Sequence, residues 1–147
     1  MVLYVYAITR KPATPDCDAV DASRHFASVC GESVCATYTP VDERAFSQEV
    51  IDRRAGDLEW LGAIGYRHQA VIADLMNENA VIPLRAFTMF SSETTLREHL
   101  VEQNELLSKI LDRLDGKREY TLRVEIDPER WSHVLVDRVE SLRRAAR

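Results

Sequence analysis

Hydrophobic and polar residues follow strand-like spacing in three parts of the chain. Residues 3–8 are apolar and rich in β-branched and aromatic side chains, which predicts a short strand. Residues 26–39 alternate between apolar and polar around Gly31, which predicts a β-hairpin that Pro40 ends. Residues 119–126 alternate as well, and they predict a strand with one face in solvent.

Two longer segments repeat apolar residues at helical spacing. The first begins at Asp57, a favourable N-cap, and the second begins at Ser91 or Ser92. Asp115 and Gly116 end the second helix, because glycine is favoured just past a helix C-terminus. The two buried faces are predicted to consist of Leu61, Ile64, His68, Val71, Ile72 and Leu75, and of Leu96, Leu100, Leu107, Ile110, Leu111 and Leu114.

Two further helices are predicted on either side of these segments. A short one covers about residues 46–54. A last one follows Asp127 and Pro128, a cap residue and a proline suited to the first helical position. Its apolar stripe consists of Trp131, Val134, Leu135, Val139 and Leu142. Since a stripe of this size would otherwise be an exposed patch, it should either fold back on the sheet or pair with another chain. Of these, we expect self-association or partner docking.

The most apolar stretch, residues 81–90, lies between the two long helices and predicts a core strand that both cover. Pro83 belongs near its start, because proline cannot donate to a sheet. Arg85 is the exception in this stretch. Because a buried guanidinium without a partner is costly, its side chain should either be paired or extend to a rim of the core. We therefore expect Arg85 to be paired and to organise the core strand. The partners considered are backbone carbonyls at a strand end and the carboxylates of Glu78, Glu93 and Glu119.

The order of these elements predicts an α+β fold with a mainly antiparallel sheet and helices on one face. The strand-helix-strand-helix-strand portion favours a ferredoxin-like sandwich. Residues 1–127 form the predicted α+β domain, and residues 128–147 form the C-terminal helix. Because this fold supports many unrelated tasks, it does not decide a function.

His68 lies in the middle of the apolar face of the first long helix, and two interpretations are open. It is either a metal ligand, haem ligand or general base, or a core histidine hydrogen-bonded to a neighbouring strand or side chain. Since no second histidine, cysteine or carboxylate shares that face, we predict a core residue without a metal. Gly62 and Gly65 each weaken the helix by about 1 kcal/mol relative to alanine, which indicates close packing there.

The three cysteines do not have the spacing of a metal site. Cys17, Cys30 and Cys35 contain no C-x-x-C pair, so zinc is not predicted. The turn after Cys30 places it opposite Cys35. In a reducing cytoplasm, two half-buried thiols are predicted in preference to a redox switch.

A net charge of -5 over 147 residues argues against general binding to nucleic acid or anionic lipid. No apolar segment approaches the length of a membrane span, and the first residues lack the basic region of a signal peptide. We therefore expect a cytoplasmic protein that binds neither nucleic acid nor membrane. No cofactor is predicted, because the sequence has no glycine-rich phosphate loop and no common catalytic motif.

Four stretches resemble the gas vesicle protein family GvpL/GvpF, in the family's order and at its spacing: residues 3–8, 59–71, 82–90 and 114–124. The most specific is 82–90, which resembles a family pattern of approximately P-L-R-F-G-T-x-F. Ala86 and Phe87 depart from that pattern, and Tyr120 stands where a tryptophan is common. The resemblance runs to about residue 127 and implies an N-terminal GvpL/GvpF domain. Members usually carry a second α+β domain, which is not apparent in this sequence, so the chain is expected to be either a short relative or a fragment.

The resemblance implies a gas-vesicle-associated accessory protein of assembly, without catalysis, that binds the hydrophobic shell protein or other accessory proteins. An acidic partner with an apolar groove or a free sheet edge is suited to such a subunit. The candidate residues for partner binding or scaffolding are Arg85, Phe87, Trp131 and Leu135. Two other function classes stay open, a ferredoxin-like module that binds a small ligand and a small α+β barrel enzyme that uses His68.

Overall fold

The fold is taken from a computed structural model, which describes residues 1–117 and the single residues 123, 125, 127, 131 and 144. The chain forms two compact units, Met1–Lys117 and Arg118–Arg147. The predicted strand 119–126 and most of the last helix, including Leu135, lie outside the described residues, so the predicted boundary after residue 127 stays a prediction. Trp131 is helical and 49% exposed, and its backbone N–H donates to the Asp127 carbonyl at 2.8 Å.

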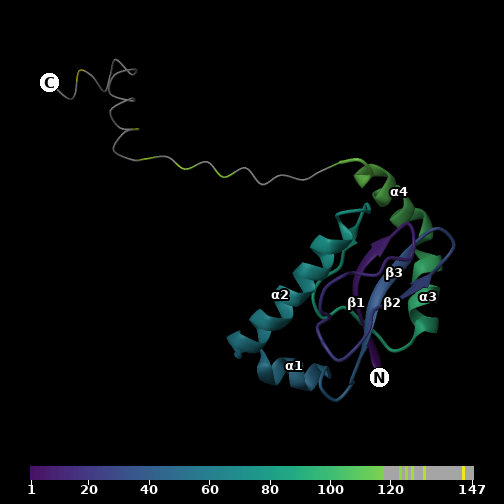
Figure 1. Cartoon of the computed structure of the whole chain (residues 1–147), viewed down its shortest axis with the longest axis horizontal. Helices are drawn as coiled ribbons and strands as arrows, with labels where there is room; N and C mark the ends of the chain where they lie inside the picture. Colours follow the sequence, from purple (N-terminus) through teal and green to yellow (C-terminus); the bar gives the residue numbers. More distant parts are fainter. Residues whose placement is uncertain (118–122, 124, 126, 128–130, 132–143, 145–147) are drawn as a thin grey trace. The chain divides into compact units, whose positions relative to one another are not determined.

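A five-stranded antiparallel sheet forms the centre of the first unit (Figure 1). β1 (Val2–Thr9) pairs with β3 (Cys35–Val41), and β2 (Ala27–Cys30) lies outside β3. β4 (Ile82–Pro83) and β5 (Met89–Phe90) both pair with β1. The predicted first strand and hairpin are therefore confirmed.

The prediction that Pro40 ends the hairpin is wrong. β3 continues to Val41, and Pro40 lies opposite Leu3 of β1. The β2 partner of β3 reaches only as far as Tyr38. Beyond Tyr38 no residue of β2 faces β3. Pro40 has no N–H to donate, but no hydrogen bond to β2 is lost at this position.

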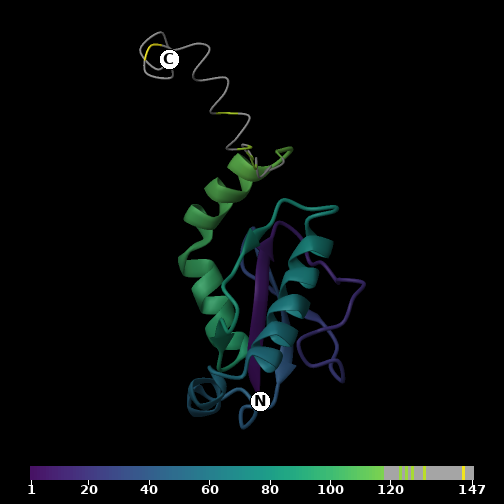
Figure 2. The same cartoon turned by 90° about the vertical axis from the view of Figure 1, so that its left-hand side faces the viewer.

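Helices cover both faces of the sheet, so the prediction of helices on one face is wrong. α2 (Leu58–Leu75) covers one face, while α3 (Glu93–Glu102) and α4 (Asn104–Leu114) cover the other; Figure 2 shows β1 between them. The reason is visible in residues 3–8, which are apolar at every position. Such a run is typical of a strand buried on both faces, whereas a half-exposed strand alternates.

Each face of the sheet has its own hydrophobic core. The core on the α2 side contains Tyr4, Tyr6, Ala7, Val20, Val41, Phe46, Ile64, Val71, Leu75 and Val81. The core on the α3 and α4 side contains Leu3, Val5, Ile8, Val29, Val34, Ala36, Tyr38, Leu96, Leu100, Leu107 and Leu111. The predicted α+β class is confirmed. The ferredoxin-like arrangement stays a prediction, because the last strand that it needs lies outside the described residues.

The predicted helix starts are confirmed by their caps. The side chains of Asp57 and Ser92 accept hydrogen bonds from the backbone N–H groups of Trp60 and Thr95, at 3.0 and 3.2 Å. The short helix α1 (Gln48–Arg54) begins slightly later than predicted. Within the described residues, no helix combines the length and the apolar content needed to cross a bilayer.

The structure does not show the close packing predicted at Gly62 and Gly65. Both lie on the exposed side of α2, and a Cβ atom built on either glycine would have no neighbouring heavy atom within 4 Å. The inner side of the same helix is buried as predicted, except for Leu61, which is half-buried. The two glycines therefore lower helix stability without any compensating contact inside the first unit.

The second long helix is two helices, contrary to the prediction of one. It is broken at Gln103, where the backbone leaves helical geometry with φ -96° and ψ 6°. The tip of the β2–β3 hairpin packs at this break. Ser33 donates from its N–H and its hydroxyl to Asn104 at 3.1 and 2.8 Å, and a Cβ on Gly31 would lie 3.1 Å from that of Leu100. These contacts give α4 its new direction, and they join residues far apart in the sequence.

Cys30 and Cys35 form a disulfide, so the prediction of two free thiols is wrong. The two residues are directly opposite in the β2–β3 register, as the predicted turn requires, with Cα atoms 4.0 Å apart. Cys17 is a free thiol. The hairpin itself therefore brings the two sulfur atoms together.

Reducing this disulfide is expected to lower the free energy of unfolding by about 2 kcal/mol, since a cross-link that closes a short loop constrains the unfolded chain only modestly. The fold should persist, because Ser33 keeps its bonds to Asn104. Urea denaturation with and without dithiothreitol measures the difference. A Cys17→Ser variant should respond as the natural chain does. An unchanged midpoint after complete reduction would contradict the expected effect.

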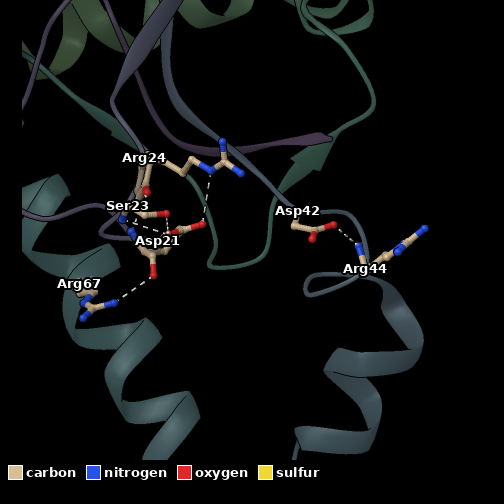
Figure 3. Close-up of polar contacts among 8 residues, drawn as sticks. Asp21, Ser23, Arg24, Asp42, Arg44 and Arg67 are labelled. Carbon is tan, nitrogen blue, oxygen red and sulfur yellow. Dashed lines mark hydrogen bonds and ion pairs between the residues drawn. The ribbon is translucent and has the colours of Figure 1, made fainter.

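The segment between β1 and β2 folds onto α2. Arg67 donates to the Val20 carbonyl at 3.2 Å, and Asp21 accepts from the backbone N–H and hydroxyl of Ser23 at 3.1 and 2.6 Å (Figure 3). The Val20 N–H donates to the Tyr6 hydroxyl at 3.0 Å. These bonds bring the buried Val20 side chain into the core on the α2 side.

Candidate partner-binding surface

The predicted core strand 81–90 is present but interrupted. Leu84 donates its N–H to the Tyr6 carbonyl, and Thr88 accepts from the Val5 N–H, each at 2.9 Å. The chain is therefore hydrogen-bonded to β1 on both sides of the interruption. β4 and β5 are the two parts of this strand.

Residues 85–87 leave the ladder and form a bulge. Thr88 closes it by donating from its backbone N–H and its hydroxyl to the Arg85 carbonyl, at 3.1 and 2.7 Å. Bulges redirect side chains that would otherwise alternate across the sheet. Arg85 and Ala86 are exposed as a result, while Phe87 is half-buried.

Phe87 adopts a left-handed backbone conformation with φ 64°. Such a conformation costs a residue with a Cβ atom about 1–2 kcal/mol, so other contacts must compensate. The Phe87 ring packs against Trp60 with ring centroids 5.6 Å apart and against Tyr4 at 6.1 Å. Its N–H donates to the Tyr4 hydroxyl at 3.1 Å. Aromatic packing and one hydrogen bond thus hold this residue in place.

Tyr4 and His68 connect the bulge to the buried centre of the molecule. His68 is 6% exposed, and its Nε2 lies 3.0 Å from the Leu84 carbonyl, an oxygen that can only accept. Nε2 therefore carries the proton, and Nδ1 accepts from the Tyr4 hydroxyl at 3.1 Å. Since that hydroxyl also accepts from Phe87, one tyrosine–histidine pair fixes the backbone at both ends of the bulge. The prediction of a packed, hydrogen-bonded core histidine is confirmed.

Burial controls the titration of this pair. It raises the pKa of Tyr4 to about 12, and it lowers the pKa of His68 despite the opposing effect of the Leu84 carbonyl. Both groups are therefore held neutral near pH 7. Neutral His68 is the form that the hydrogen-bond directions require.

Stability is expected to fall as the pH drops below about 6.5, the ordinary histidine pKa. Below that value His68 is protonated in the unfolded chain but stays neutral in the folded chain, because burial lowers its pKa in the folded state. The loss continues until the pH reaches the folded pKa, and the full contribution is present above the unfolded value. Urea midpoints between pH 5.5 and 7.5 measure this slope. His68→Gln should have a smaller slope, and an equal slope in the two proteins would contradict the assignment.

Arg85 is not paired as predicted. Its side chain is exposed, and within the described residues its guanidinium makes no ion pair or hydrogen bond. Glu93 instead accepts from the Tyr38 hydroxyl, and Glu78 lies in solvent. Glu119 lies outside the described residues. The bulge explains the error, because it carries residue 85 away from the sheet while Leu84 and Phe87 stay packed against the two cores.

Trp60 supports the bulge from the start of α2. The Arg54 guanidinium lies 4.5 Å from the centre of the Trp60 ring and also donates to Asp57 at 2.8 Å. Trp60, Arg85, Ala86 and Phe87 together are the candidate partner-binding surface: an exposed cation and small side chain above half-buried aromatic rings. Such a surface is suited to contact with another protein, since aromatic residues and arginine dominate interface energetics.

The structure brings together two of the four predicted candidate residues, Arg85 and Phe87. Trp131 belongs to the second unit, and Leu135 lies outside the described residues. The sequence did not predict Trp60 as part of this surface, or Tyr4 as the buried residue that holds it. For Trp60, the sequence feature that could have predicted this role is an aromatic residue in the first turn after the Asp57 cap. For Tyr4, it is a hydroxyl-bearing residue within a strand that is otherwise apolar.

Comparison with known proteins gives a family match and one similar protein. The family model described as "Gas vesicle synthesis protein GvpL/GvpF" matches residues 2–147. The chain is 28% identical over 133 residues to "Gas vesicle protein L" from Streptomyces sp. (strain CB03234). That match covers 85% of this chain and 48% of the relative, so the chain spans about half the length of the relative. No solved structure matches.

The bulge accounts for the glycine in the pattern P-L-R-F-G-T-x-F. When Pro83 and Thr88 are placed on the P and T of that pattern, the glycine falls on Phe87, whose φ is positive. Glycine adopts this conformation without strain. In this chain the aromatic residue stands one position later, and its packing on Trp60 compensates for the strain.

Proposed function

Because the chain belongs to the GvpL/GvpF family of gas vesicle synthesis proteins, we propose that it is a non-catalytic accessory protein of gas vesicle assembly that binds the hydrophobic shell protein. The candidate partner-binding surface makes the contact. The protein acts in the cytoplasm, in association with the growing gas vesicle and with other accessory proteins.

The observation that carries this proposal is the rigid attachment of the bulge. Backbone groups at both ends of residues 85–87 are bonded to the buried pair Tyr4 and His68. A surface held in this way loses little conformational entropy when a partner binds. The binding free energy is then not reduced by the cost of ordering a loop. Both ring nitrogens of His68 are occupied in holding the bulge, which favours a structural role for this residue.

Other parts of the proposal concern regions beyond the described residues. We propose that residues 119–126 complete a ferredoxin-like domain, which then ends near residue 127. Trp131 and Leu135, on the predicted C-terminal stripe, offer a second contact for an accessory protein. Two surfaces on one chain suit a protein that brings several components together.

Co-purification of the shell protein with the full chain tests the proposal. Arg85→Glu is expected to lower the recovered shell protein at least about tenfold, as loss of one interface hot spot does. Arg44→Glu is the matched control, because Arg44 is also exposed and its side chain makes no ion pair among the described residues. Equal amounts of shell protein recovered with the two variants would show that the contact lies outside the bulge. If the natural chain recovers no shell protein, the proposal of shell binding is contradicted.

A further inference from the structure

The disulfide between Cys30 and Cys35 lies one residue pair away from the turn of the β2–β3 hairpin. Glu32 and Ser33 make this turn, and neither has a positive φ. The two-residue turns that match the twist of a hairpin need a positive φ at one or both of these positions. The turn by itself therefore does little to keep the strand ends together, and the disulfide joins them directly.

The hairpin tip, residues 31–34, is also held from outside the hairpin by α3 and α4. Ser33 donates from its N–H and its hydroxyl to Asn104, at 3.1 and 2.8 Å. The Arg97 guanidinium donates to the Cys30 carbonyl. These bonds are exposed to solvent, where water competes for the same groups and the net stabilisation is small. Whether the disulfide is closed should therefore affect how often the tip opens.

A purely structural role does not explain this disulfide. Cys30 and Cys35 are five positions apart, and a cross-link that closes so short a loop constrains the unfolded chain only modestly. Disulfides in cytosolic proteins are usually transient or redox-sensing, because cellular thiols reduce them. The cytoplasmic location is the one premise taken from the proposed function. In that compartment the bond is subject to reduction.

The two sulfur atoms differ in their access to solvent. Cys30 is half-buried on the edge strand β2, whereas Cys35 is 5% exposed on β3, which lies between β1 and β2. Access decides which sulfur an attacking thiolate reaches, so Cys30 is the point of attack. Cys17 is a poor competitor, because burial and the neighbouring aspartates raise the pKa of its thiol and lower its thiolate fraction.

We propose that the disulfide between Cys30 and Cys35 is a reversible redox element, which glutathione-class thiols reduce and glutathione disulfide forms again. One thiolate attacks the Cys30 sulfur and forms a mixed disulfide, while Cys35 leaves as a thiolate and takes up a proton. A second thiolate attacks the glutathione sulfur of the mixed disulfide and releases Cys30, which is protonated in turn. Two thiols are thereby oxidised to one disulfide, and the protein gains two electrons and two protons. In the reduced state the hairpin tip opens more often, while the fold persists.

Thiol counting in glutathione buffers tests the redox step. The full chain is equilibrated without oxygen at a series of ratios of reduced to oxidised glutathione, alkylated, and weighed by mass spectrometry. The chain has three cysteines, so the alkylated count should change reversibly from one to three across ratios that span the cytoplasmic poise. Cys17→Ser is the control, and its count should change from zero to two at the same ratio. A count that stays at one, or at three, over the whole series would overturn the proposal.

Amide hydrogen exchange tests the effect on the hairpin tip. The N–H groups of Gly31 and Ser33 are both hydrogen-bonded, and reduction should speed their exchange at least about tenfold while β1 is unaffected. A chain with both Cys30→Ser and Cys35→Ser should exchange at the tip as the reduced natural chain does, at every glutathione ratio. Equal tip exchange in the oxidised and reduced natural chains would overturn the proposed control of the tip. The shell protein is absent from both measurements, so failure of shell binding leaves their outcome unchanged.

Discussion

Replacing Tyr4 with phenylalanine is expected to lower the free energy of unfolding by about 2–4 kcal/mol, because it leaves two polar groups without partners. The Phe87 N–H and the Nδ1 of His68 both bond to the Tyr4 hydroxyl, which lies in the core. The ring remains, so packing changes little and the lost hydrogen bonds dominate. Urea denaturation measures the change, and faster amide exchange at Phe87 should accompany it.

Tyr66→Phe is the control for this substitution. The Tyr66 side chain is 78% exposed, so loss of its hydroxyl should change stability by no more than about 0.5 kcal/mol. Equal effects of Tyr4→Phe and Tyr66→Phe would show that the tyrosine–histidine pair does not fix the bulge.

Leu100→Ala is expected to destabilise the protein by about 2–5 kcal/mol, the usual cost of a cavity in a close-packed core. Leu100 is 0% exposed, and it lies where the hairpin tip at Gly31 approaches α3. Thermal or urea unfolding measures the loss. Val101→Ala is the control, since Val101 is 46% exposed and its truncation leaves no cavity. A loss below about 1 kcal/mol for Leu100→Ala would mean that the core on this side can relax around the deletion.

The sequence predicted elements whose signals are local. The caps at Asp57 and Ser92 and the helix stop at Asp115 and Gly116 depend on residues within one turn of the helix end, and Gly116 has the expected positive φ of 67°. The hairpin depends on a short turn between neighbouring strands. His68 was placed correctly in the core because helical spacing alone decides which residues share a face.

The errors concern contacts between distant parts of the chain. The break at Gln103 depends on the hairpin tip, where Ser33 and Asn104 meet across 71 positions. The exposure of Arg85 depends on a bulge, and Phe87 bonds to Tyr4 across 83 positions. No local pattern encodes such pairs, so the apolar residues 81–90 predict a regular strand where the structure has a bulge. The apolar character of residues 3–8 did contain the information that helices cover both faces of the sheet.

The most direct test of shell binding is the light scattering of shell protein diluted from denaturant in the presence of the full chain. An unassembled hydrophobic subunit aggregates when its apolar surface is free, and a partner that covers that surface prevents this. The natural chain at equimolar concentration is predicted to suppress the scattering, Arg44→Glu to act as well as the natural chain, and Arg85→Glu to act much less. Scattering that the natural chain leaves unchanged would contradict the proposed role in holding the shell protein.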